Sequence, residues 1–215
     1  MKRFTICTIL LVVTAIPGLG QAQWSVGPHI AISVPTADFA NVSDVGGGFG
    51  VKVVRQFSSV NGFALRGDFA FLSHGREFQT VNTFSGTFVA EVRQQSFRLN
   101  LGPQFTFGTD NLKFYVGART GFYVFRTSIN VSTGVGFITA DDQADAAVGW
   151  NAGGGIQYDI GLGPLLDVAV EYQTIYNITT EFEIQDNQGQ TVSETRDITA
   201  NEFTVKLGVT FFLGK

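Results

Sequence analysis

The chain has 215 residues, of which only 15% are charged, and its formal net charge is −4. Water-soluble domains usually carry about a quarter charged residues, so this composition is unusual for a domain surrounded by water. The acidic balance argues against a nucleic-acid partner, because phosphate binding requires a basic face. A single cysteine, Cys7, excludes a disulfide within the chain.

The N-terminal segment predicts export from the cytoplasm. Two basic residues precede an apolar run from Phe4 to Ile16, and small residues stand at Gly20 and Ala22. This is the pattern of a cleaved signal peptide, and the run is too short to span a bilayer as a helix. We therefore expect residues 1–22 to be removed and residues 23–215 to form one domain.

Eight later segments alternate between apolar side chains and polar or small ones, which is the period of a β-strand. Each has about the length that a tilted strand needs to cross the hydrocarbon of a membrane. In the last of them, six apolar residues from Phe203 to Leu213 fall on one face without interruption. The predicted strands are residues 24–33, 46–57, 63–73, 94–107, 112–126, 147–160, 165–176 and 203–213.

Short and long connections alternate along the chain. Turn signals occur at residues 58–62, 108–111 and 161–164. Between them lie long polar stretches, which we predict to be loops, at residues 35–45, 74–92, 127–146 and 177–199. This order predicts an up-and-down meander of eight antiparallel strands. Its asymmetry is typical of a barrel with one end in a periplasm and the other outside the cell.

Alternation alone does not say which face of the sheet points outward, because a soluble lipocalin-like calyx has the same period with its apolar face inside. The polar face carries five basic and five acidic residues. This balance suits mutual pairing in a closed interior, although a solvated outer face would also explain it. The asymmetric connections and the aromatic residues near strand ends favour lipid around the apolar face. The charged residues are Lys52, Arg66, Asp68, Arg98, Arg119, Asp159, Asp167, Glu171, Glu202 and Lys206.

Three stretches carry a resemblance to a known family: Leu112–Ala118, Trp150–Gly155 and the end of the chain. Together with the eight-strand meander, they resemble the small outer-membrane β-barrel family that includes the OmpA transmembrane domain and OmpX. The resemblance implies an all-β fold, an eight-stranded antiparallel up-and-down transmembrane β-barrel. It also implies that the protein resides in the outer membrane of a bacterium.

The resemblance further implies an assembly signal in the last strand. In the family this signal begins with a polar residue and has a glycine two residues later. An apolar residue follows three residues after the glycine, and a second apolar residue two residues after that. Lys206, Gly208, Phe211 and Leu213 match it. Family members often end on an aromatic residue, whereas this chain adds a glycine and a lysine after Leu213. The expected partners are the barrel-assembly machinery, outer-membrane lipid and lipopolysaccharide, and an extracellular ligand bound through the loops.

The sequence offers little for an enzyme. Its two histidines are His29, which we expect to form hydrogen bonds inside the barrel, and His74, which we expect in a loop. Ser73 precedes His74 directly, so on a strand their side chains would point to opposite faces and could not act as nucleophile and base. We expect no catalytic, cofactor-binding or metal-binding residues, and no cofactor.

The predicted function is that of an integral outer-membrane protein with a structural, surface-interaction or narrow porin-like role. The paired charges are expected to plug the lumen, because side chains can fill an eight-stranded barrel. Two alternatives stay open. One is a soluble lipocalin-like ligand carrier, and the other, which has less support, is an outer-membrane enzyme that modifies lipid A.

Overall fold

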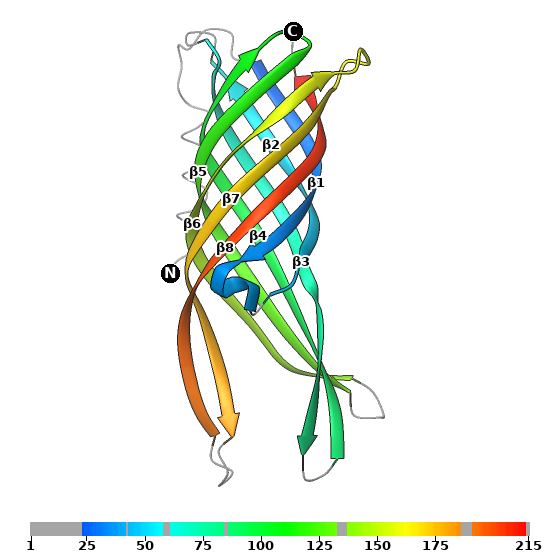
Figure 1. Cartoon of the computed structure of the whole chain (residues 1–215), viewed down its shortest axis with the longest axis vertical. Coiled ribbons are helices and arrows are strands. Elements are labelled where there is room, and N and C mark those ends of the chain that lie inside the picture. Colours follow the sequence, from blue (N-terminus) through cyan, green and yellow to red (C-terminus); the bar gives the residue numbers. More distant parts are fainter. Residues whose placement is uncertain are drawn as a thin grey trace, which may run out of the picture.

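The computed structural model describes residues 23–41, 43–57, 61–83, 86–132, 137–185 and 191–213, and the predicted signal peptide lies outside them. The strands pair in chain order and β8 pairs with β1, which closes the sheet into a barrel (Figure 1). This confirms the predicted eight-stranded antiparallel barrel. The elements are β1 (Gln23–Thr36), the 3₁₀-helix η1 (Ala37–Asn41), β2 (Gly46–Gln56), β3 (Phe63–Thr83), β4 (Gly86–Gly108), β5 (Leu112–Ser132), β6 (Phe137–Asp159), β7 (Leu165–Gln185) and β8 (Thr191–Leu213).

The barrel has two different ends. At the turn end, Trp24 pairs with Leu213, and the three short connections join β2 to β3, β4 to β5 and β6 to β7. Glycines at positive φ occur in these turns, with φ values of 79° at Gly62 and 123° at Gly108. Other residues adopt such values only with strain, so the turn glycines fix where the strands reverse. Within the described ranges, no helix is long and apolar enough to cross a membrane.

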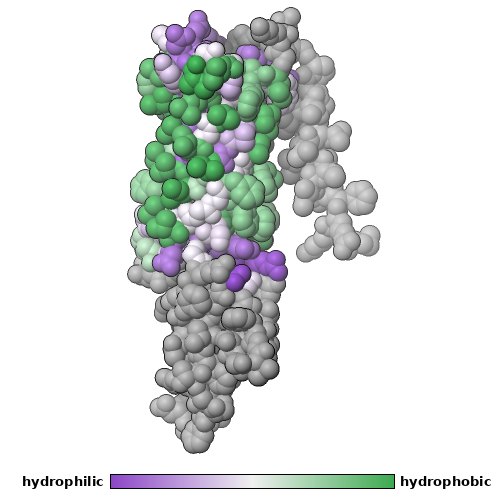
Figure 2. All heavy atoms as spheres, turned by 90° about the vertical axis from the view of Figure 1, so that its right-hand side faces the viewer, coloured by the Kyte–Doolittle hydropathy of each residue, from purple (hydrophilic) through white to green (hydrophobic). Residues whose placement is uncertain are grey.

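The wall of the barrel is apolar outside and polar inside. Ile30 and Phe49 are 59% and 61% exposed on the outer face, whereas Arg66 and Glu202 are 2% and 0% exposed on the inner face. Figure 2 shows hydrophobic residues along the wall, with hydrophilic residues gathered at the two ends of the coloured part. The predicted strand phases are therefore confirmed. A lipocalin-like calyx requires the reverse arrangement, so the structure does not favour that alternative.

At the end opposite the turns, which we call the hairpin end, three of the four predicted loops are wrong. Residues predicted as loops at 74–92, 127–146 and 177–199 largely continue the strands. The β3–β4 ladder runs to Thr83 and Gly86, and the β7–β8 ladder runs to Gln185 and Thr191. Beyond a membrane a strand no longer needs a fully apolar face, so polar residues become frequent while the backbone hydrogen bonds of the pair continue. Three hairpins therefore project past the closed barrel, as Figure 1 shows at its lower end.

Candidate functional site

A ring of four charged side chains crosses the middle of the lumen. The Arg66 Nη2 atom lies 2.7 Å from Asp68 Oδ2 and 3.0 Å from Glu171 Oε1. The Lys206 Nζ atom lies 2.8 Å from Asp68 Oδ1 and 2.9 Å from Glu171 Oε2. Each cation thus touches both carboxylates, and each carboxylate touches both cations. We call these four residues the charge ring; they tie β3, β7 and β8 together across the barrel.

Arg119 extends the ring to β5. Its Nη2 atom lies 2.9 Å from Glu171 Oε1, and its Nε atom donates a hydrogen bond of 2.7 Å to Asn151 Oδ1 on β6. Glu171 therefore faces three cations and is itself buried. Ions buried out of water need partners of this kind, because an unpaired charge in the interior is strongly unfavourable.

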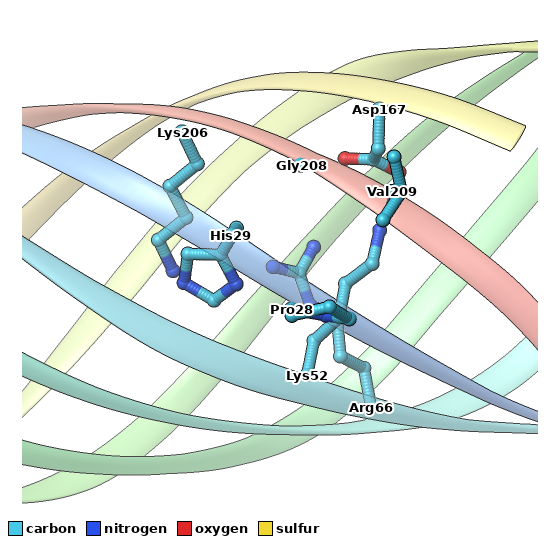
Figure 3. A pocket seen from close by; sticks show the side chains of 8 residues that line it. All are labelled: Pro28, His29, Lys52, Arg66, Asp167, Lys206, Gly208 and Val209. Carbon is cyan, nitrogen blue, oxygen red and sulfur yellow. The ribbon is translucent and has the colours of Figure 1, made fainter.

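A second set of contacts lies toward the turn end. Lys52 forms an ion pair with Asp167, which joins β2 to β7. Tyr115 Oη donates a hydrogen bond of 2.9 Å to Asp167 Oδ1, and Gln157 Nε2 donates one of 2.7 Å to Asp167 Oδ2. Figure 3 shows Lys52, Arg66 and Lys206 reaching into the interior with His29 and Asp167. The space left beside them has no room for a water molecule.

A third set lies toward the hairpin end. Arg98 forms an ion pair with Glu202 of β8, and its Nε atom donates a hydrogen bond of 3.2 Å to Ser96 Oγ. The His74 Nε2 atom lies 3.3 Å from Arg98 Nη2 and 3.1 Å from Ser96 Oγ. The expectation that His74 belongs to a loop is therefore wrong. β3 continues past it, and an irregularity in the β3–β4 pairing at Gly75, whose φ is 61°, follows directly.

Nine of the ten charged residues predicted for the lumen lie in these three sets. The exception is Asp159, whose Oδ1 atom accepts a hydrogen bond of 2.7 Å from the Gly161 backbone in the β6–β7 turn. The predicted balance of five and five thus becomes five basic residues against four acidic ones. His29, expected to form hydrogen bonds inside the barrel, is buried there, with its Nδ1 atom 3.4 Å from the Gly27 carbonyl and its Nε2 atom 3.9 Å from Asp68.

The residues of the predicted assembly signal divide between the two faces of β8. Lys206 points into the lumen, whereas Phe211 and Leu213 are exposed on the outer wall. Gly208 lies opposite His29 at the β1–β8 seam, where a Cβ atom would come within 2.7 Å of His29 Cβ and would clash with the Pro28 carbonyl oxygen. The glycine therefore has a packing role in the closed barrel.

Two tyrosines of the site were not among the predicted residues. Tyr115 bonds Asp167, and Tyr123 Oη donates a hydrogen bond of 2.6 Å to Asn100 Oδ1. The phase of β5 places both on the polar face, because Phe114, Val116 and Phe122 point outward. Strand phase was therefore the signal that could have found them. Among the described residues, no group of three or more histidine, cysteine, aspartate or glutamate side chains could hold a metal ion.

Inward-facing glycines make room for the large lumen groups. Gly153 pairs with Glu171 and Gly155 pairs with Tyr115 across neighbouring strands. A Cβ atom on Gly155 would lie 2.5 Å from Tyr115 Oη, and one on Gly27 would lie 2.5 Å from Lys52 Cε. An eight-stranded barrel has little interior volume, so a long charged side chain fits only beside a neighbour without one. This arrangement accounts for some of the 26 glycines in the chain.

We expect Gly153→Ala to destabilise the barrel by about 1–3 kcal/mol, the usual range for overpacking. Its Cβ atom would clash with the Val170 carbonyl oxygen and lie 2.7 Å from Glu171 Cα, and backbone atoms cannot easily shift. Urea unfolding in lipid vesicles, followed by tryptophan fluorescence, measures the change. Gly47→Ala is the matched control, because a Cβ there meets nothing within 4 Å. Equal unfolding midpoints for the two variants would show that the interior has spare room.

An apolar outer wall around a buried network of ion pairs defines an integral membrane β-barrel. The sequence model of the outer membrane protein beta-barrel domain family matches residues 8–211, so the chain belongs to this family and resides in the bacterial outer membrane. No curated protein matches the chain.

Solved structures show the same fold. A major outer membrane protein from Thermus thermophilus is 11% identical with a TM-score of 0.57, and the match covers 89% of this chain and 99% of that one. OprG from Pseudomonas aeruginosa is 15% identical with a TM-score of 0.55, over 90% of this chain and 96% of that one. Neisserial surface protein A is 14% identical with a TM-score of 0.50, and the match covers 89% of this chain and 98% of that one. At these identities the likeness concerns the fold alone.

Proposed function

We propose that the protein is a closed outer-membrane barrel that anchors and presents its three projecting hairpins at the cell surface. The observation that carries this proposal is the charge ring, because Arg66, Asp68, Glu171 and Lys206 meet across the lumen. A lumen closed by side chains leaves no path for diffusing solutes. The role is then structural or surface-facing, and any conductance is narrow.

The proposal includes an orientation and a set of partners. The hairpin end faces outside and the turn end faces the periplasm, as the short and long connections of such barrels do. The hairpins are the surface that contacts an extracellular ligand, while lipid and lipopolysaccharide contact the wall. Residues 1–22 direct export, and the barrel-assembly machinery recognises β8 through Lys206, Gly208, Phe211 and Leu213.

The lipid A-modifying enzyme receives little support from the placement of the histidines. His29 and His74 are both buried in the lumen, in contact with the charge network. A group that acts on lipid A must reach the lipid, and neither side chain lies on the outer wall. We therefore propose a protein without enzymatic activity.

Conductance measurements test the closed lumen. We expect the purified protein in planar lipid bilayers to carry no sustained ion current, and proteoliposomes to exclude small sugars in a swelling assay. A general porin in the same lipid is the positive control, and empty bilayers are the negative one. Steady porin-like currents, or swelling at the rate of the porin control, would contradict the proposal.

A further inference from the structure

The 3₁₀-helix η1 covers part of the hairpin end of the lumen through its Phe39 side chain. η1 follows β1 directly, and its Phe39 side chain is only 5% exposed. The Phe39 ring meets the rings of His74 and Phe125 edge-on, with centroid distances of 6.0 Å and 6.1 Å. In Figure 1 η1 is the short blue helix at the end of β1. The apolar cluster that Phe39 joins comes from β5 to β8 and contains Tyr123, Phe125, Ala147, Ile175, Ile178 and Ala200.

The polar lumen begins directly beneath Phe39. The His74 ring that Phe39 touches is bonded to Ser96 and Arg98, and Arg98 pairs with Glu202. Arginine can only donate, so His74 Nε2 is the acceptor in its contact with Arg98. Phe39 therefore separates a buried, hydrogen-bonded charge pair from the water at the hairpin end.

The attachment of η1 differs from that of the strands. β1 and β2 are held by backbone ladders on both sides, whereas Phe39 is held by ring packing in the apolar cluster. Ala37, at the start of η1, has a φ of 52°, a left-handed conformation that strains a residue with a Cβ atom. Packing of Phe39 thus favours the covered state, and strain at Ala37 opposes it.

We propose that η1 is a lid, and that withdrawal of Phe39 opens a blind vestibule at the hairpin end. The apolar cluster forms the walls of this vestibule, His74, Arg98 and Glu202 line it below, and the charge ring forms its floor. Solutes from outside enter it without crossing the barrel. The lid is a second closure, independent of the charge ring, and it controls access to the lumen rather than passage through it.

Cysteine labelling tests the lid on the full-length protein in lipid nanodiscs, in a Cys7→Ser background. The reporter is Ser33→Cys. Ser33 pairs with Gly46, which in turn pairs with His74, so it lies near the proposed vestibule. It is 0% exposed, and its Oγ has no hydrogen-bond partner among the described residues. With Phe39 present we expect slow reaction with a charged methanethiosulfonate reagent. Phe39→Ala should speed the reaction about ten- to a hundredfold, the scale of losing one buried phenylalanine, and Phe39→Leu should change it little.

Two further variants make the result specific. Ala37→Asn should slow labelling about threefold, because asparagine tolerates the left-handed conformation and favours the covered state. Ser25→Cys lies buried on the turn side of the charge ring and should not respond to Phe39→Ala. Equal Ser33→Cys labelling with and without Phe39 would overturn the lid. Fast labelling of both reporters with Phe39 in place would instead contradict the closed barrel itself.

Discussion

Glu171→Gln is expected to lower the free energy of unfolding by about 3–5 kcal/mol, the usual effect of removing one partner from a buried ion pair. Arg66 and Lys206 would keep Asp68 as a partner. Arg119 would lose the negative charge that lies 2.9 Å from it and would face only neutral amide groups, those of Asn151 and of the new glutamine. The variant therefore leaves a buried guanidinium without a counterion. Urea unfolding in lipid vesicles measures the loss.

Two companion variants separate this effect from a general loss of charge. Asp159→Asn removes a carboxylate that lies outside the network, so its effect should stay below about 1 kcal/mol. Adding Arg119→Gln to Glu171→Gln should recover part of the stability, because it removes the orphaned cation, and a double-mutant cycle reports the coupling. If Glu171→Gln unfolds at the same urea concentration as Asp159→Asn, the contacts of Glu171 with three cations do not stabilise the barrel.

Leu207→Arg is expected to destabilise the barrel by about 2–4 kcal/mol, the range for arginine at the midplane of a lipid-facing wall. Leu207 lies on the outer face of β8, where it pairs with Ile30 of β1 and Val168 of β7. In a bilayer the guanidinium would enter hydrocarbon. The unboiled protein should also show a weaker folded band on a denaturing gel.

The control is the same substitution in water. Leu162 is 79% exposed in the β6–β7 turn, beyond the end of the strands, so Leu162→Arg should change stability by less than about 0.5 kcal/mol. A soluble barrel would tolerate arginine at both positions. Equal stabilities for the two variants would therefore argue against lipid around the wall.

The inward or outward direction of each side chain could be predicted from the sequence, because the outer face of every strand meets lipid and the inner face meets the polar lumen. Lipid accepts only apolar side chains over the whole wall, so the period of two is visible in every strand and places Arg66 and Glu202 inside. The hairpins gave a weaker signal. Residues 178–185 still alternate, with Ile178, Phe182 and Ile184 in one phase, but polar residues outnumber them, and the pairing with β8 continues through this stretch.

The sequence could not predict which lumen side chains pair with one another. Lys52 and Asp167 are 115 residues apart, and their contact depends on the tilt and stagger of the closed barrel. Asp159 shares the face of Gln157 but lies one step closer to the turn end, where a backbone amide replaces a lumen cation as its partner. His74 was misplaced because its polar neighbours resemble a loop, although β4 continues beside it.

The charge ring can form only when β3, β7 and β8 are all in place. Lys206 is 138 residues from Asp68, and Arg66 is 105 residues from Glu171, so an unfinished sheet cannot form the ring. Until β8 docks on β1, the inner face keeps its charges in water, which opposes settling of the open sheet into hydrocarbon. Contacts made this late slow unfolding more than they speed folding. We therefore expect the ring to form when the last strand arrives and to slow the reopening of the finished barrel.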